Sequence, residues 1–129
     1  MAYIADVSDI EKVIGRIKEC LALRKMRVLA HREVNKQTAE EFGILSTNLS
    51  KLIIDKLKVS NCVEGPVPDD DPKRAAGEVY KFIVDMSYLE YGEIYFKIKF
   101  EKDFDIMYLI VISVHKKNMT NQRSGWNGK

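Results

Sequence analysis

Hydrophobic and polar residues alternate most clearly between residues 91 and 117, and this stretch predicts a β-hairpin. Residues 93–100 alternate at a period of two, which places Ile94, Phe96, Ile98 and Phe100 on one side of a strand. A charged connection at residues 101–105 leads into a second strand at residues 106–117, which is apolar in its middle and polar at its end. A connection of this length is typical of a hairpin with a bulge or a longer turn.

The register of the hairpin can be inferred from burial, because a shift by one residue exchanges the two faces of a sheet. We expect the apolar side of the first strand to lie beside the even-numbered residues of the second: Ile106, Tyr108, Ile110, Ile112 and Val114. The opposite face then carries Tyr95, Lys97, Ser113 and His115, together with Met107, Leu109 and Val111. A phenol, an ammonium, a hydroxyl and an imidazole on one face form a candidate site.

The N-terminal part of the chain predicts helices. Ser8 and Glu11 have the spacing of a capping box, and apolar residues three and four positions apart follow to about Leu23. The first helix therefore covers residues 8–23, with Cys20 as a buried thiol. Residues 27–32 fit either a short strand or a continuation of this helix.

Two more helices and a long loop are expected before the strands. A helix over residues 36–42 ends at Gly43, and another over residues 48–57 follows Ser46 or Thr47. Residues 59–77 contain all three prolines and two of the seven glycines, so we expect a loop that is either functional or mobile.

The loop includes three consecutive aspartates, residues 69–71. They suggest a divalent cation and hence a metal-dependent nuclease. Consecutive carboxylates lack the alternating ligand spacing of a calcium loop, however, and a solvated turn before Pro72 also explains them.

Residues 78–85 predict a further strand, with Tyr80, Phe82 and Val84 on one face and Val79, Lys81 and Ile83 on the other. The order of elements indicates an α+β fold in which N-terminal helices pack on an antiparallel β-meander. We expect one domain over residues 1–117 and a flexible tail over residues 118–129, which carries Trp126.

The charge and cysteine content of the chain exclude few classes of function. The net charge of +2 is too small to indicate nucleic-acid binding by the whole chain. Residues 16–32 contain six basic residues and one acidic residue, including Arg24, Lys25 and Arg27, and form either a solvated helix face or a patch that contacts RNA phosphates. The two cysteines have no metal-binding spacing, and we expect a reduced, cytoplasmic protein without a membrane span or cofactor.

Four short motifs appear in a fixed order: EGPVPDDD, GEVYKF, GEIYFKIKF and LIVISVHK. Their order and spacing, from about Ile44 to Lys117, resemble the MqsR family of toxin–antitoxin toxins, which are similar to the RelE-like group of ribonucleases that cleave messenger RNA. The matching residues are Gly65, Pro66, Tyr80, Lys81, Phe82, Ile94, Tyr95, Lys97, Ser113, Val114 and His115. Tyr80 replaces the usual Trp, Val114 the usual Phe, and Glu64 lies near a lysine that some relatives use in catalysis.

The resemblance implies an endoribonuclease that cleaves mRNA selectively, without a metal, and is inhibited by an antitoxin protein. Such cleavage needs a base, an acid and cations that stabilise the phosphate. His115 is the candidate acid or base, and Tyr95 could serve if nearby cations lower its pKa. Lys81 and Lys97 are the candidate phosphate-binding cations. The candidate RNA-binding residues are Tyr80, Ser113, Arg24, Lys25 and Arg27.

A different interpretation is also consistent with the residue types, and the departures at Tyr80 and Glu64 motivate it. His115, Tyr95 and Lys97 can be ordinary outward-facing residues of strands, where tyrosine is favoured in any case. The chain would then be a non-enzymatic binding module of the same fold that engages a protein or RNA partner.

Overall fold

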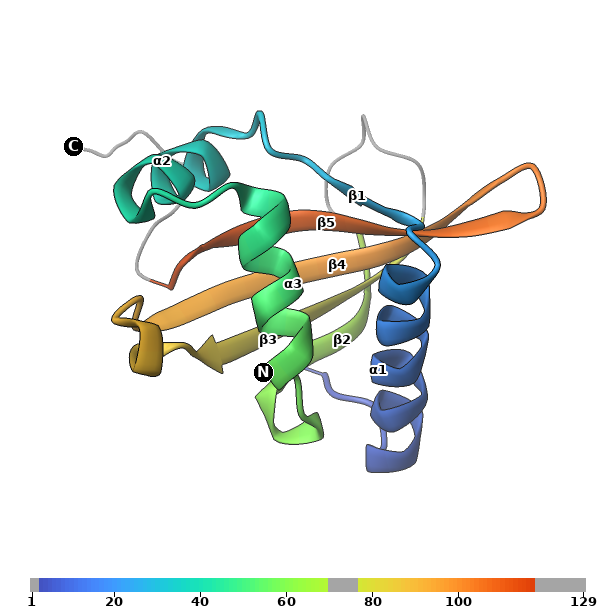
Figure 1. Cartoon of the computed structure of the whole chain (residues 1–129). Helices are drawn as coiled ribbons and strands as arrows, with labels where there is room; N and C mark the ends of the chain where they lie inside the picture. The colour runs from blue at the N-terminus through green and yellow to red at the C-terminus, as the bar shows by residue number, and fades with distance from the viewer. Residues whose placement is uncertain (1–2, 70–76, 118–129) are drawn as a thin grey trace.

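The computed structural model describes residues 3–69 and 77–117, which form three α-helices and a five-stranded sheet (Figure 1). The helices are α1 (Val7–Ala22), α2 (Glu33–Phe42) and α3 (Ser46–Lys56). The strands are β1 (Met26–Val28), β2 (Cys62–Pro68), β3 (Glu78–Asp85), β4 (Glu93–Asp103) and β5 (Ile106–Lys116). Short 3-10 turns cover Val59–Asn61 and Ser87–Leu89.

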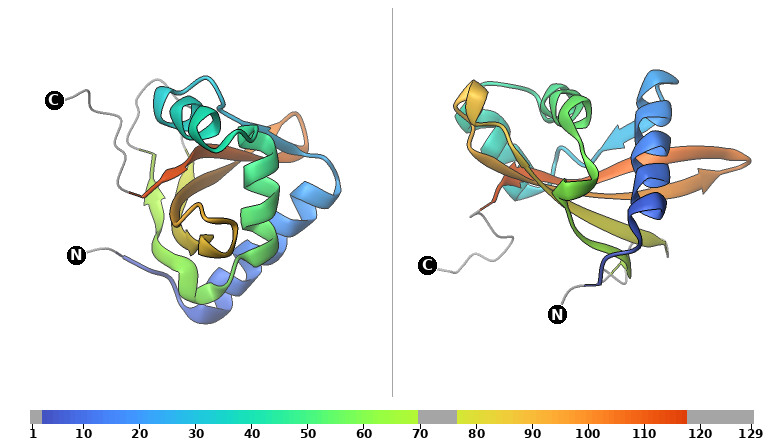
Figure 2. Two further views of the ribbon diagram at one scale, coloured as in Figure 1. Left: turned by 60° about the vertical axis from the view of Figure 1, so that its left-hand side comes forward. Right: turned by 90° about the horizontal axis from the view of Figure 1, so that it is seen from below.

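The sheet has the strand order β1-β5-β4-β3-β2. Strands β2 to β5 form an antiparallel meander, and β1 joins β5 in parallel at one edge. Figures 1 and 2 show α1 and α3 lying across the same face of the sheet. The predicted α+β class, with N-terminal helices packed on an antiparallel meander, is confirmed, and β1 is an addition to it.

The main hydrophobic core lies between these helices and the sheet. Ile10 and Ile17 of α1 and Ile53 of α3 are fully buried against Phe82 of β3 and Phe96 of β4. Their spacing follows the helical and strand periods that predicted the elements. A second, smaller cluster on the opposite face consists of Val79, Ile110 and Ile112, with Leu29, Val67 and Tyr108 packed against it.

A bulge in β5 changes which residues of this strand face the core. Lys97 pairs with Ser113, but the next residue of β4, Ile98, pairs with Val111, so Ile112 is an extra residue. Residues before the bulge therefore have the opposite orientation from the one predicted. Leu109 and Val111 lie in the main core, and Ile110 and Ile112 lie on the other face. Val114 lies beyond the bulge and therefore faces the main core, as predicted.

The hairpin is also longer than predicted. Residues 101–103 continue β4, and the turn contains only Phe104 and Asp105. The two strands project together beyond the rest of the sheet (Figure 1), and Lys102 and Asp103 are exposed to solvent there.

The predicted loop at residues 59–77 was wrong in its first half, because residues 62–68 form β2. Proline cannot donate a hydrogen bond to a strand partner, which is why it is confined to edge strands and bulges. β2 is such an edge strand, and its pairing with β3 is interrupted at two places. Gly65 has a φ of +138°, and a Cβ there would lie 2.8 Å from the Cα of Tyr80, so this position requires glycine.

Several helix boundaries differ from the predicted ones. The N-H of Ala5 donates to the carbonyl of Gly65, and α1 begins shortly afterwards, with Asp6 as the N-cap and no side-chain cap. The predicted capping box of Ser8 and Glu11 is wrong because helical backbone already starts at Val7. The ambiguous segment at residues 27–32 contains a strand, and α2 and α3 begin earlier than expected. Gly43 ends α2 in a left-handed conformation, as predicted.

α2 covers the edge of β5 beyond the end of β1. Asn35 accepts a hydrogen bond from the N-H of Val114, and its amide donates to the carbonyl of Ile112. One turn later, the Thr38 hydroxyl accepts from the N-H of Lys116. Side chains of α2 thus take the place of a neighbouring strand, so the backbone groups of β5 are satisfied.

Within the described ranges, no helix is long and apolar enough to cross a membrane. The predicted tail at residues 118–129 and two of the three consecutive aspartates, Asp70 and Asp71, lie outside these ranges.

Candidate functional site

The polar residues predicted to share one face of the hairpin do lie together. Tyr95 pairs with His115, and Lys97 pairs with Ser113 on the neighbouring strand. Lys81 of β3 pairs with Lys97 from the other side. Three adjacent strands therefore place a phenol, an imidazole, a hydroxyl and two ammonium groups on one face, opposite the main core.

His115 is the central titratable group of this site. It is 5% exposed, and its ring lies 5.2 Å from the ring of Tyr95, centroid to centroid, at an angle of 44°. Its Nδ1 is 2.8 Å from the carbonyl oxygen of Lys116. A carbonyl only accepts hydrogen bonds, so Nδ1 carries the proton and Nε2 carries the lone pair.

The surroundings keep this imidazole neutral. Burial lowers the pKa of His115 below 6.5, and the positive charges of Arg32 and Lys97 lower it further. The hydrogen bond to the Lys116 carbonyl opposes this shift. A neutral imidazole with its lone pair on Nε2 can accept a proton at pH 7, which is the property of a general base.

Arg32 belongs to the site although the sequence did not indicate it. It lies just before α2 and donates from Nη1 to the Ser113 hydroxyl at 2.7 Å and to the Ile112 carbonyl at 2.6 Å. The only sequence signal was its membership of the basic segment at residues 16–32. Its position follows from the docking of α2 along β5, which a local pattern cannot reveal.

Glu64 and Lys81 form an ion pair at the β2 side of the site. The Glu64 carboxylate is 2.7 Å from the Lys81 ammonium, and both side chains are about a quarter exposed. The two residues are also register partners in β2 and β3. Glu64 therefore holds a candidate cation of this chain in place.

Tyr80 does not lie with these residues. It is on the core face, 9% exposed, and packs in the main hydrophobic cluster. Burial raises the pKa of its phenol, and the carboxylate of Glu78 raises it further. The structure thus places this predicted RNA-binding residue on the side of β3 opposite to Lys81.

The basic residues at positions 24, 25 and 27 do not form one patch with the site. Arg27 lies on β1 near the tip of the hairpin, 3.2 Å from the Asp103 carboxylate, with its guanidinium 3.9 Å from the centre of the Tyr108 ring. Arg24 lines a groove on the helix side of the sheet. Lys25 lies between them in the sequence, half-buried and just before β1.

Asp69 is not part of a solvated turn, contrary to the simpler interpretation of the aspartate run. Its carboxylate is 2% exposed and lies 3.0 Å from the ammonium of Lys99, which is fully buried. Lys99 also contacts Glu101 at 3.0 Å. Within the described residues, no group of three or more His, Cys, Asp or Glu side chains could hold a metal ion.

No model of a known protein family matches the chain, and neither a curated protein nor a solved structure matches it.

Proposed function

We propose that this chain is an endoribonuclease that cleaves messenger RNA and uses His115 as its general base. The observation that carries the proposal is the neutral imidazole with its lone pair on Nε2, next to Tyr95 and among the cations of Lys97, Lys81 and Arg32. RNA is unusual among biological phosphodiesters in having its own nucleophile, the 2′-hydroxyl, so a base and a cationic surface suffice to start cleavage.

The proposed reaction begins when Nε2 of His115 removes the proton of a 2′-hydroxyl. The 2′-oxygen attacks the adjacent phosphorus, and the bond from phosphorus to the 5′-oxygen of the next nucleotide breaks. The products are a 2′,3′-cyclic phosphate and a 5′-hydroxyl, which takes its proton from the Tyr95 phenol. Arg32 and Lys97 stabilise the additional negative charge of the pentacoordinate phosphate. The Glu64 ion pair positions Lys81 for a neighbouring phosphate.

The biological context of the proposal rests on the resemblance to the MqsR family and its RelE-like relatives. The chain would act in the cytoplasm as the toxin of a type II toxin–antitoxin system, and an antitoxin protein would inhibit it. Gly65, which the fold requires at the close approach of β2 and β3, is one of the residues that carry this resemblance.

The experiment compares purified wild type with His115→Ala and Tyr95→Phe on total messenger RNA, with and without EDTA. His31→Ala is the matched control, because His31 is the other histidine and its side chain is exposed. We expect wild type and His31→Ala to cut RNA in the presence of EDTA and both site variants to lose about 100-fold or more in rate. Cleavage that persists in His115→Ala, or stops with EDTA in wild type, would refute the proposal.

A second function is favoured by one specific observation, the burial of the site. His115 and Ser113 are 5% and 3% exposed, and the polar groups are occupied by one another, as in Arg32 with Ser113 and Glu64 with Lys81. In this second function the network has a structural role alone: it stabilises the sheet of a non-enzymatic binding module. A folded wild type that leaves messenger RNA intact and does not arrest growth of a bacterial host would support this second function.

A further inference from the structure

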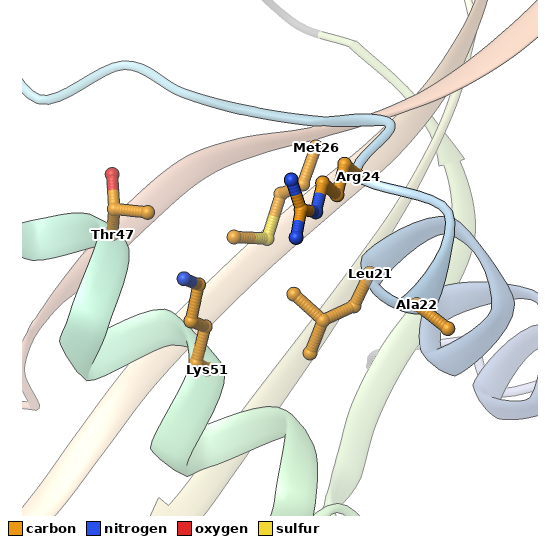
Figure 3. Close-up of a pocket in the computed structure, with 6 residues that line it drawn as sticks. All are labelled: Leu21, Ala22, Arg24, Met26, Thr47 and Lys51. Carbon is orange, nitrogen blue, oxygen red and sulfur yellow. The ribbon is translucent and has the colours of Figure 1, made fainter.

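A groove on the helix side of the sheet is lined by cationic and apolar residues. It lies between the end of α1, the start of β1 and the first two turns of α3, and its volume is about 610 Å³ (Figure 3). The lining residues are Leu21, Ala22, Arg24, Met26, Thr47 and Lys51. Met26 pairs with the core residue Leu109, so the groove opens on the face opposite His115 and Tyr95.

The lining combines two cations with an apolar wall. Figure 3 shows the Lys51 ammonium extending from α3 toward the side where the guanidinium of Arg24 and the thioether of Met26 lie. Among the described residues, none that lines the groove is acidic. Neither Arg24 nor Lys51 forms an ion pair with any residue in the described part of the chain. Two like charges facing one opening repel each other unless an anion lies between them.

The backbone of Arg24 provides an independent observation. The N-H of Arg24 donates to the Leu21 carbonyl and that of Lys25 to the Cys20 carbonyl, which is the hydrogen-bond pattern of a Schellman motif at the end of α1. Arg24 occupies the left-handed position of this motif, with a φ of +59°, where glycine is strongly favoured. Arg24 therefore occupies a conformation that the backbone disfavours, as Glu90 and Phe104 also do in this chain, and such conformations are enriched at binding sites.

We propose that this groove binds an organic phosphate monoester. The phosphate would lie between Arg24 and Lys51, because two cations match its charge of about −2 at neutral pH and a guanidinium binds phosphate oxygens in pairs. The Thr47 hydroxyl would donate a further hydrogen bond. An aromatic or aliphatic body would cover Leu21 and Met26, and the volume is in the usual range for a small-molecule site.

The test is isothermal titration of the full chain with AMP, adenosine, inorganic phosphate and a short oligonucleotide. We expect AMP to bind, and to bind more tightly than either inorganic phosphate or adenosine, because only AMP satisfies both the cations and the apolar wall. Lys51→Gln should weaken AMP binding by about tenfold or more. Lys18→Gln is the matched control, since Lys18 is exposed on α1 and does not line the groove.

Arg24→Gly separates a binding role from a structural one. Glycine removes the guanidinium but suits the left-handed backbone, so we expect this variant to lose AMP binding while its melting temperature rises by a few degrees. A lower melting temperature would overturn the inference from the backbone of Arg24.

Three outcomes would overturn the proposed ligand. These are the absence of AMP binding at millimolar concentration, an affinity for adenosine or inorganic phosphate equal to that for AMP, and binding of the oligonucleotide that depends on Lys51 and is tighter than that of AMP. Binding is measured here without RNA cleavage, so a failure of the ribonuclease proposal leaves this result unaffected.

Discussion

Asn35 should be one of the most important polar residues for the stability of this fold. It is fully buried and joins α2 to the end of β5, beyond the part that pairs with β1. Its Nδ2 donates to the carbonyls of Leu29 and Ile112, both at 2.9 Å, and its Oδ1 accepts from the N-H of Val114 at 2.8 Å. The perturbation is Asn35→Ala, which removes all three hydrogen bonds.

The loss of stability can be estimated from the hydrogen bonds that each partner of Asn35 retains. The Ile112 carbonyl still accepts from Arg32 Nη1, and the Leu29 carbonyl still accepts from the Arg32 backbone N-H. These two losses should cost about 0.5–1 kcal/mol each. The Val114 N-H loses the acceptor it has in the wild type and stays buried, which costs about 1–3 kcal/mol. Asn35→Ala should therefore lower the free energy of unfolding by about 2–5 kcal/mol, a large part of the ~5–15 kcal/mol typical of a domain.

The assay is urea denaturation combined with hydrogen exchange of the Val114 amide. Lys36→Ala is the matched control, because the next residue of α2 is exposed and should change stability by less than about 0.5 kcal/mol. In Asn35→Ala the Val114 amide should exchange much faster than in the control. A loss below about 1 kcal/mol with unchanged exchange would refute the reasoning that α2 replaces a strand at this edge.

Asn35→Asp gives a second, chemically distinct check. The new carboxylate can accept from Val114 but cannot donate to the two carbonyls, so its ionised form is disfavoured in the folded state. Its pKa should be higher in the folded than in the unfolded state. The deficit in stability relative to wild type should therefore shrink as the pH falls from 7 towards 4.

Other predictions concern charge, backbone and pH. Lys99→Met should lower the free energy of unfolding by about 3–5 kcal/mol in urea denaturation, because it leaves the buried carboxylate of Asp69 without its ion pair to Lys99. Replacing Asp69 with Leu as well should restore much of this loss. No recovery in the double variant would count against a direct coupling of the two residues. Gly65→Ala should lower the free energy of unfolding by about 2–5 kcal/mol, since a Cβ would overlap Tyr80. Gly15→Ala in α1, where a Cβ would have no atom within 4 Å, should instead raise it by up to about 1 kcal/mol. Similar effects at both sites would contradict this reasoning. Burial lowers the pKa of His115 in the folded state, so as the pH falls the imidazole is protonated first in the unfolded chain. Wild type should therefore lose stability relative to His115→Asn as the pH falls from 7 through that lowered pKa. RNA cleavage, if His115 is the base, should fall only below pH 6.5; an acid limb above 6.5 would assign the base to another group.

Much of the candidate site could be predicted from the sequence. Tyr95 and Lys97 are two residues apart in a regular strand, and Ser113 and His115 are two apart in the next, so each pair shares a face wherever the strands lie. Pairing the two strands by their apolar residues brought the four together correctly. The correct part of the register was the part between the bulge and the end of β5.

The rest of the site depended on contacts between distant segments. Arg32 reaches Ser113 across 81 positions of sequence, and Asn35 reaches Val114 across 79. Neither belongs to an apolar repeat or a short motif that would connect it to β5. Lys99 alternates like an exposed residue but is fully buried, because Asp69 and Glu101 pair with it.

The sequence by itself determined the local elements, because hydrophobic periodicity records which side of each helix or strand avoids water. The helices, β3 and the β4–β5 hairpin were found in this way. Tertiary structure decided that β2 is a strand, since an edge position tolerates prolines that would exclude a central one. It also decided the bulge at Ile112, because an extra residue is accommodated only by the way both faces of β5 pack. The candidate base and its cations thus combine a local pattern, which places Tyr95 and His115, with a long-range contact, which adds Arg32.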